Sequence, residues 1–193
     1  ITINEHYFEA YNNLGVALHK LKNHTEAEKN LTQALKINPE FAEACCNIGS
    51  VLADQKKYQK AIQYFNKALK INPNYAEAYN SRGSCLRDKK ELKESLLSFD
   101  QAISLKPNYP DAFYNKGNSL KDQGKLLDAL NCYNQALKWN PDLFKAHSER
   151  LFLLNQICDW SQLDELDAVL KKLGISTPSV DPFGFLPMED HPE

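Results

Sequence analysis

Residues 42–75 read AEACCNIGSVLADQKKYQKAIQYFNKALKINPNY, and variants of this 34-residue stretch stand before and after it in the chain. The recurrence is clearest in four prolines that lie 34 residues apart: Pro39, Pro73, Pro107 and Pro141. Small residues and large apolar residues return at the same period. A fixed period of this length is typical of stacked-repeat proteins, which usually work by displaying a surface.

Within each repeat, the apolar residues predict two helices. In residues 8–41, one stripe at helical spacing is Tyr11, Leu14, Gly15 and Leu18, and a second stripe is Ala27, Leu31, Ala34 and Leu35. Asn38-Pro39 ends the second helix, because proline disfavours helical geometry in the residue before it. We therefore predict an all-α, right-handed solenoid of antiparallel helix pairs over residues 8–41, 42–75, 76–109 and 110–143.

A column of glycines marks a packing requirement. Glycine inside a helix costs roughly 1 kcal/mol relative to alanine, yet it recurs at Gly15, Gly49, Gly83 and Gly117. We expect this cost to be offset by close contact between the two helices of each pair, with large residues such as Leu31, Phe65, Phe99 and Tyr133 filling the space around them.

These columns resemble the tetratricopeptide repeat (TPR). Its pattern of an aromatic residue, Leu-Gly, Ala, Phe or Tyr, Ala and Pro is matched from Tyr11-x-x-Leu14-Gly15 through Pro39, and again from Tyr79 through Pro107. Departures are mild: Arg82 and Lys116 replace leucine, and Cys45 replaces an aromatic residue. The resemblance implies that the first helices line a concave surface and that the chain binds other proteins.

The two ends of the chain depart from the repeat. Residues 1–7 align with the end of a repeat, so we expect further repeats to precede them. Residues 144–174 read as a degenerate fifth repeat followed by a capping helix from about Trp160 to Lys172, and residues 175–193 as an extended, proline-rich linker.

The C-terminal segment carries a second resemblance. Cys158-Asp159-Trp160 with Leu163-Asp164-Glu165, followed by Pro182-Phe183 and Pro192-Glu193, is similar to the junction where the repeats of O-linked N-acetylglucosamine (O-GlcNAc) transferase-like proteins meet the catalytic region. The resemblance implies that the donor-nucleotide site lies beyond Glu193. The alternative is an ordinary capping helix with a proline-rich linker.

Composition restricts the function further. A net charge of −2 without a basic stripe argues against nucleic-acid binding, and no apolar run approaches the roughly 18 residues that a membrane span needs. The five cysteines are odd in number and lack metal-ligand spacing, so they predict buried thiols in a reducing compartment, the cytoplasm. The five histidines form no apparent ligand cluster. We expect no cofactor, no metal and no catalytic site.

The polar side of the first helices repeats as regularly as the core. An amide column contains Asn13, Asn47, Ser81 and Asn115, and a carboxylate column contains Asp54, Asp88 and Asp122. Asparagine is a poor mid-helix residue, so its recurrence at one phase needs a reason. An amide both donates and accepts hydrogen bonds and can pair with the backbone of an extended peptide. We include the neighbouring Asn12, Asn80 and Tyr114 in this candidate peptide-binding set.

Several functions remain open. The leading hypothesis is a peptide-binding repeat region that recruits substrates for an O-GlcNAc transferase-like glycosyltransferase. The alternative is a structural scaffold or adaptor with no linked enzyme. A clamp for acidic tails is disfavoured because three aspartates lie on the proposed surface. The oligomeric state is not predicted.

Overall fold

The computed structural model describes residues 7–157. In this part of the chain all regular structure is helical: α1 (Tyr7–Lys20), α2 (His24–Ile37), α3 (Ala42–Asp54), α4 (Tyr58–Ile71), α5 (Ala76–Asp88), α6 (Leu92–Leu105), α7 (Pro110–Asp122), α8 (Leu126–Trp139) and α9 (Phe144–Gln156). The chain divides into two units, residues 1–150 and 151–193. The first unit contains α1–α8 and the start of α9.

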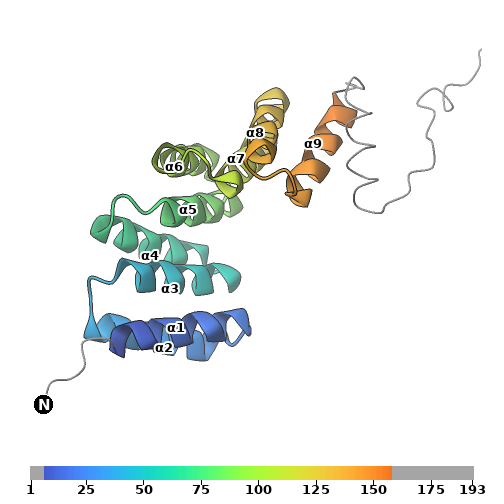
Figure 1. Ribbon diagram of the computed structural model, residues 1–193. Helices are drawn as coiled ribbons and strands as arrows, with labels where there is room; N and C mark the ends of the chain where they lie inside the picture. The colour runs from blue at the N-terminus through green and yellow to red at the C-terminus, as the bar shows by residue number, and fades with distance from the viewer. Residues whose placement is uncertain (1–6, 158–193) are drawn as a thin grey trace, which may run out of the picture. The chain divides into compact units, whose positions relative to one another are not determined.

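Helices α1–α8 form a stack of antiparallel pairs, as the repeat pattern predicts (Figure 1). Each first helix packs on the second helix of its own repeat, and each of α2, α4 and α6 packs on the first helix of the next repeat. The first helices also contact one another, α1 with α3, α3 with α5 and α5 with α7. We call the side of the stack formed by α1, α3, α5 and α7 the first-helix surface.

The repeated prolines end the second helices, as predicted. Helices α2, α4, α6 and α8 each stop two residues before the proline, and the capping residue donates its backbone N–H to the alanine four residues earlier. Pro110 begins α7, where its missing N–H breaks no helical hydrogen bond.

The glycine column lies at close helix contacts, as predicted. A β-carbon built on Gly83 would lie 2.7 Å from a ring carbon of Phe99, and one built on Gly117 would lie 2.6 Å from a ring carbon of Tyr133. Phe99 and Tyr133 are fully buried. Each glycine therefore accommodates the large core residue of its partner helix.

The turns between paired helices contain a feature that sequence analysis missed. The second of their three residues has positive φ in every repeat, with values of 62° at Lys22, 59° at Lys56, 66° at Lys90 and 76° at Gly124. The backbone N–H of the following residue bonds the carbonyl oxygen five residues back, as from Asn23 to Leu18 at 2.9 Å. This is the Schellman motif, which usually employs glycine at the left-handed position; three of the four repeats employ lysine.

Several sequence predictions fall outside the described residues. They are the tail of a preceding repeat in residues 1–7, of which only Tyr7 is described, the capping helix from Trp160 to Lys172 and the extended linker of residues 175–193.

Candidate functional site

The first-helix surface carries the two polar columns that sequence analysis identified. Asn13 of α1 is exposed, while Asn47, Ser81 and Asn115 on α3, α5 and α7 are half-buried. The carboxylate column lies at the C-terminal ends of the same helices, since Asp54, Asp88 and Asp122 are the last residues of α3, α5 and α7.

Asn47 is held by a hydrogen-bonded chain that crosses two helices. Its Nδ2 donates to Oδ1 of Asn12 at 2.8 Å, and Nδ2 of Asn12 donates to Oε1 of Glu43 at 3.0 Å. A carboxylate only accepts, so Asn12 must present Nδ2 to Glu43 and its oxygen to Asn47. Asn47 must then turn its own Oδ1 away from this contact. Asn12 is only 1% exposed, so it orients Asn47 from below the surface.

An equivalent pair of asparagines occurs two repeats later. Nδ2 of Asn115 donates to Oδ1 of Asn80 at 3.0 Å. Asn80 also hydrogen-bonds the phenol of Tyr109, whose pKa burial raises to about 12. Asn12 and Asn80 are therefore supporting residues for the amide column.

Asn13 and Ser81 differ from these two asparagines. Neither side chain makes a hydrogen bond within the described residues, so their polar atoms are available to a ligand or to water. Tyr114 lies on α7 with its ring 5.9 Å from that of Tyr133, and Nζ of Lys145 lies 4.7 Å from the Tyr114 ring centre. Tyr114 thus has an aromatic and a cationic neighbour.

Each residue of the carboxylate column is paired with a base from the chain itself. Oδ2 of Asp54 lies 3.0 Å from His19 Nε2 and 3.3 Å from Lys22 Nζ, while Asp88 pairs with Arg87 at 3.2 Å and Asp122 with Lys90 at 3.6 Å. Burial of the Asp54 carboxyl opposes its charge, but hydrogen bonds from His19 and Lys22 outweigh this effect and lower its pKa. A peptide that used these carboxylates would compete with the chain's own bases.

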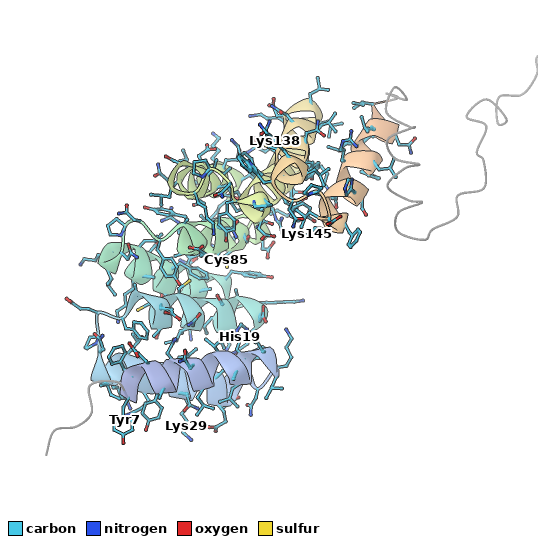
Figure 2. All side chains as sticks on the ribbon, viewed as in Figure 1. Tyr7, His19, Lys29, Cys85, Lys138 and Lys145 are labelled. Carbon is cyan, nitrogen blue, oxygen red and sulfur yellow. The ribbon has the colours of Figure 1, made fainter. Side chains whose placement is uncertain are left out.

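The expectation that the histidines form no ligand cluster is wrong for two of them. His19, His24 and Asp54 each offer a ligand atom, and these atoms all lie within 4.8 Å of one another. His19 lies at the end of α1, beside α3 (Figure 2). The spacing of these residues in the sequence carries no metal motif, because Asp54 reaches the histidines only through the stacking of α3 on the first pair.

The four described cysteines are buried and free, in agreement with the role predicted for them. Burial raises the pKa of Cys46 and Cys85 to about 12 and that of Cys132 to about 11. At neutral pH these thiols stay protonated and serve as small core residues.

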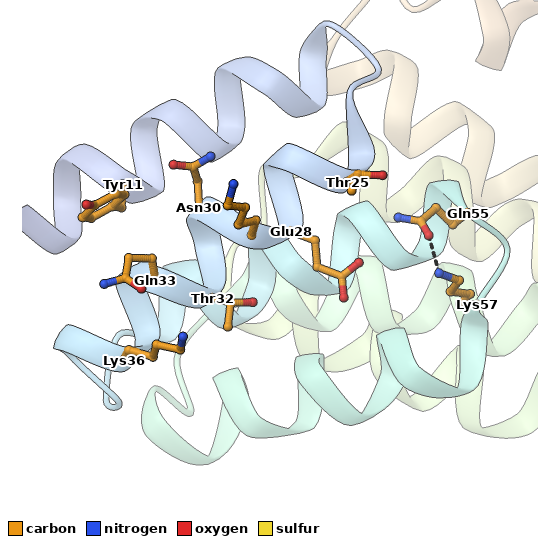
Figure 3. Close-up of a pocket in the computed structure, with 10 residues that line it drawn as sticks. Tyr11, Thr25, Glu28, Asn30, Thr32, Gln33, Lys36, Gln55 and Lys57 are labelled. Carbon is orange, nitrogen blue, oxygen red and sulfur yellow. Dashed lines mark hydrogen bonds between the residues drawn. The ribbon is translucent and has the colours of Figure 1, made fainter.

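A groove of about 750 Å³ lies away from the amide column, along α2 (Figure 3). Its lining comes from Tyr11 of α1, the polar side of α2, and Gln55 and Lys57 of the turn after α3. Its lining contains three lysines and one glutamate, and none of its residues belongs to the amide or the carboxylate column.

Stacked helix pairs with a regular polar surface define a helical-repeat protein-interaction module. The tetratricopeptide-repeat family model matches residues 8–41, 42–75 and 110–143, and two further TPR models match residues 64–96 and 83–124. The chain therefore belongs to the tetratricopeptide repeat family. No curated protein sequence matches it significantly.

Solved TPR structures share the fold. PilF of Pseudomonas aeruginosa superposes with a TM-score of 0.80 at 21% identity, covering 89% of this chain and 78% of that one. MamA residues 41 to the end, from Desulfovibrio magneticus RS-1, superposes with a TM-score of 0.74 at 22% identity, covering 90% of this chain and 98% of that one.

These comparisons establish an all-α TPR solenoid. The TPR is a non-catalytic interaction module, in agreement with the expectation that this chain is not an enzyme. None of the described helices is both long and apolar enough to cross a bilayer.

Proposed function

We propose that this chain is a peptide-binding TPR module whose amide column, formed by Asn13, Asn47, Ser81 and Asn115, hydrogen-bonds the backbone of an extended partner. The observation that carries the proposal is the internal pairing of Asn47 with Asn12 and of Asn115 with Asn80. Each pairing uses one N–H of the outer amide and leaves its oxygen and a second N–H available.

Fixing the outer amides lowers the cost of binding. An asparagine that is already held in one orientation loses less side-chain freedom when a ligand arrives. Backbone groups are the same in every peptide, so this mode favours extended segments of varied sequence. The carboxylate column would favour basic or hydroxyl-bearing side chains in positions where these displace Lys22, Arg87 or Lys90.

The finer proposal is that this module recruits protein substrates for an O-GlcNAc transferase-like glycosyltransferase. It is supported by the resemblance of residues 158–193 to the repeat-to-catalytic junction of those enzymes. We further propose a cytoplasmic location, supported by the free, buried thiols. Sequencing the gene beyond the codon for Glu193 tests the link to an enzyme: a glycosyltransferase region supports it, and its absence leaves an adaptor.

A structural scaffold is the second candidate. The observation that favours it is the same pair of internal hydrogen bonds, because they give Asn47 and Asn115 a role in joining repeats without any ligand. Binding measurements at positions that lack such a bond separate the two functions.

Asn13 and Ser81 are those positions. A phage-displayed library of unstructured peptides should yield binders, and replacing Asn13 by Ala should weaken them by about 2- to 12-fold, the value of one net hydrogen bond. Ser81→Asn, which completes the amide column, should tighten them. Gln63→Ala, at an exposed position on α4, is the matched control and should change nothing. Unaltered binding in both column variants would leave the scaffold as the better account.

A further inference from the structure

We propose that His19, His24 and Asp54 bind a divalent transition-metal ion, with Zn²⁺ as the simplest probe, and that the ion joins the first helix pair to the second. The three residues come from three elements: the last turn of α1, the first residue of α2 and the last residue of α3. The proposed site shares Asp54 with the carboxylate column, but its test does not require a peptide.

The geometry is close to that of a zinc site. A ring nitrogen of each histidine and a carboxylate oxygen of Asp54 all lie within 4.8 Å of one another, and the distance from His19 Nε2 to Asp54 Oδ2 is 3.0 Å. Zinc bonds of about 2.0–2.2 Å in a tetrahedron place ligand atoms roughly 3.4 Å apart. The two ligand atoms that lie farthest apart must therefore approach each other by at most about 1.5 Å, which small rotations of the side chains provide.

His24 supplies an independent observation. Among the described side chains, its Nδ1 is the one buried nitrogen or oxygen without a hydrogen-bond partner. Buried polar atoms are almost always satisfied, so such an exception calls for an explanation. Its ring centre lies 5.6 Å from that of His19. A metal ion bound by the ring would satisfy an imidazole nitrogen that the protein itself leaves unpaired.

The donor set indicates which metals fit. Two imidazoles with one carboxylate suit Zn²⁺, Ni²⁺ or Co²⁺, whereas Ca²⁺ and Mg²⁺ prefer oxygen ligands alone. Three protein ligands leave room for water in the remaining position. Lys22 Nζ, 3.3 Å from Asp54 Oδ2, stands where it would compete with the ion. Its side chain is 74% exposed and can move into solvent.

The site belongs to one repeat boundary alone among those described. The residues in the same columns are Ala53, Tyr58 and Asp88 at the next boundary, and Arg87, Leu92 and Asp122 at the one after. Both later sets keep the aspartate and lose the histidines. The chain thus contains its own controls, because only the first boundary can form the site.

Isothermal titration of the full, untagged chain with ZnCl₂ under a non-chelating reductant tests the proposal. One equivalent of Zn²⁺ should bind and raise the melting temperature, while MgCl₂ and CaCl₂ should do neither. His19→Gln, His24→Gln and Asp54→Asn should each weaken binding by about tenfold or more, equivalent to about 1.4 kcal/mol. Asp88→Asn and His147→Gln should bind zinc as the parent does.

Two further measurements keep the test decisive if a histidine variant folds poorly. Lys22→Asn removes the competing cation, and asparagine tolerates the positive φ of this position. The variant should therefore bind zinc about two- to fivefold more tightly. Hydrogen exchange should slow in α1–α3 on adding zinc and stay unchanged in α7 and α8. The absence of zinc binding by the parent, or equal affinity in the His19, His24 and Asp54 variants, would overturn the proposal.

Discussion

Nδ2 of Asn47 donates to Oδ1 of Asn12 across a separation of 35 residues, one more than the repeat period. Asn115 and Asn80 are paired over the same separation, as are Asp54 and His19. Side chains on the first-helix surface therefore meet one residue out of register with the sequence columns. Asn12 and Asn80 support Asn47 and Asn115 of the amide column, so the two asparagines of each pair have different roles.

This pairing predicts unequal effects within the amide column. Replacing Asn47 by Ala should destabilise the fold by about 1–3 kcal/mol, because it leaves the oxygen of the buried Asn12 without its donor. Asn13→Ala should be neutral or slightly stabilising, since Asn13 makes no internal hydrogen bond and alanine is the better helix former. Urea denaturation of both variants measures the difference. Equal stability would contradict the supporting role of Asn12.

The glycine column predicts a steric penalty. Gly83→Ala should cost about 1–3 kcal/mol and Gly83→Leu more, because the added β-carbon falls 2.7 Å from the buried ring of Phe99. This penalty exceeds the roughly 1 kcal/mol that alanine gains in helix propensity. Thermal unfolding followed by circular dichroism measures the difference. A Gly83→Ala variant more stable than the parent would show that the Phe99 ring moves aside at little cost.

The positive-φ positions in the turns predict opposite effects of two substitutions on stability. Gly124 has φ of 76° and would leave an added β-carbon in open space, so Gly124→Ala should lose about 1–2 kcal/mol through backbone strain alone. Lys90→Gly, at the equivalent position, should gain up to about 1 kcal/mol. Denaturation midpoints should move in opposite directions; shifts of the same sign would exclude the conformational explanation.

The buried thiols predict both reactivity and pH dependence. At pH 8, iodoacetamide should label Cys46 and Cys85 only after unfolding, as peptide mass spectrometry can show. Their folded pKa of about 12 exceeds the ordinary 9.0, so the folded state keeps protons that the unfolded state releases. The contribution of these thiols to the stability of the fold should therefore be fully present below about pH 9 and should be lost as the pH rises from 9 towards 12. Labelling of the folded protein at pH 8, or a denaturation midpoint that does not change up to pH 11, would contradict this prediction.

The sequence predicts the helix pairs, the glycine contacts and the helix ends, because each depends on residues at fixed spacing within one repeat. It predicts the surface columns for the same reason. It could not predict which columns meet, since that depends on how far one pair rotates on the next. The pairing of Asn12 with Asn47 and the approach of Asp54 to His19 and His24 both follow from that rotation. The left-handed lysines were missed because lysine carries no turn signal, whereas Gly124 does.

We propose above all that an extended partner lies along the amide column. Site-specific photocrosslinking tests it most directly, with p-benzoylphenylalanine placed in turn at Ser81 on α5 and at the exposed Gln63 on α4. Peptides selected from a random library should crosslink at Ser81 and not at Gln63, and excess unlabelled peptide should abolish the product. Crosslinking at Gln63 with none at Ser81 would place the partner elsewhere and contradict the account.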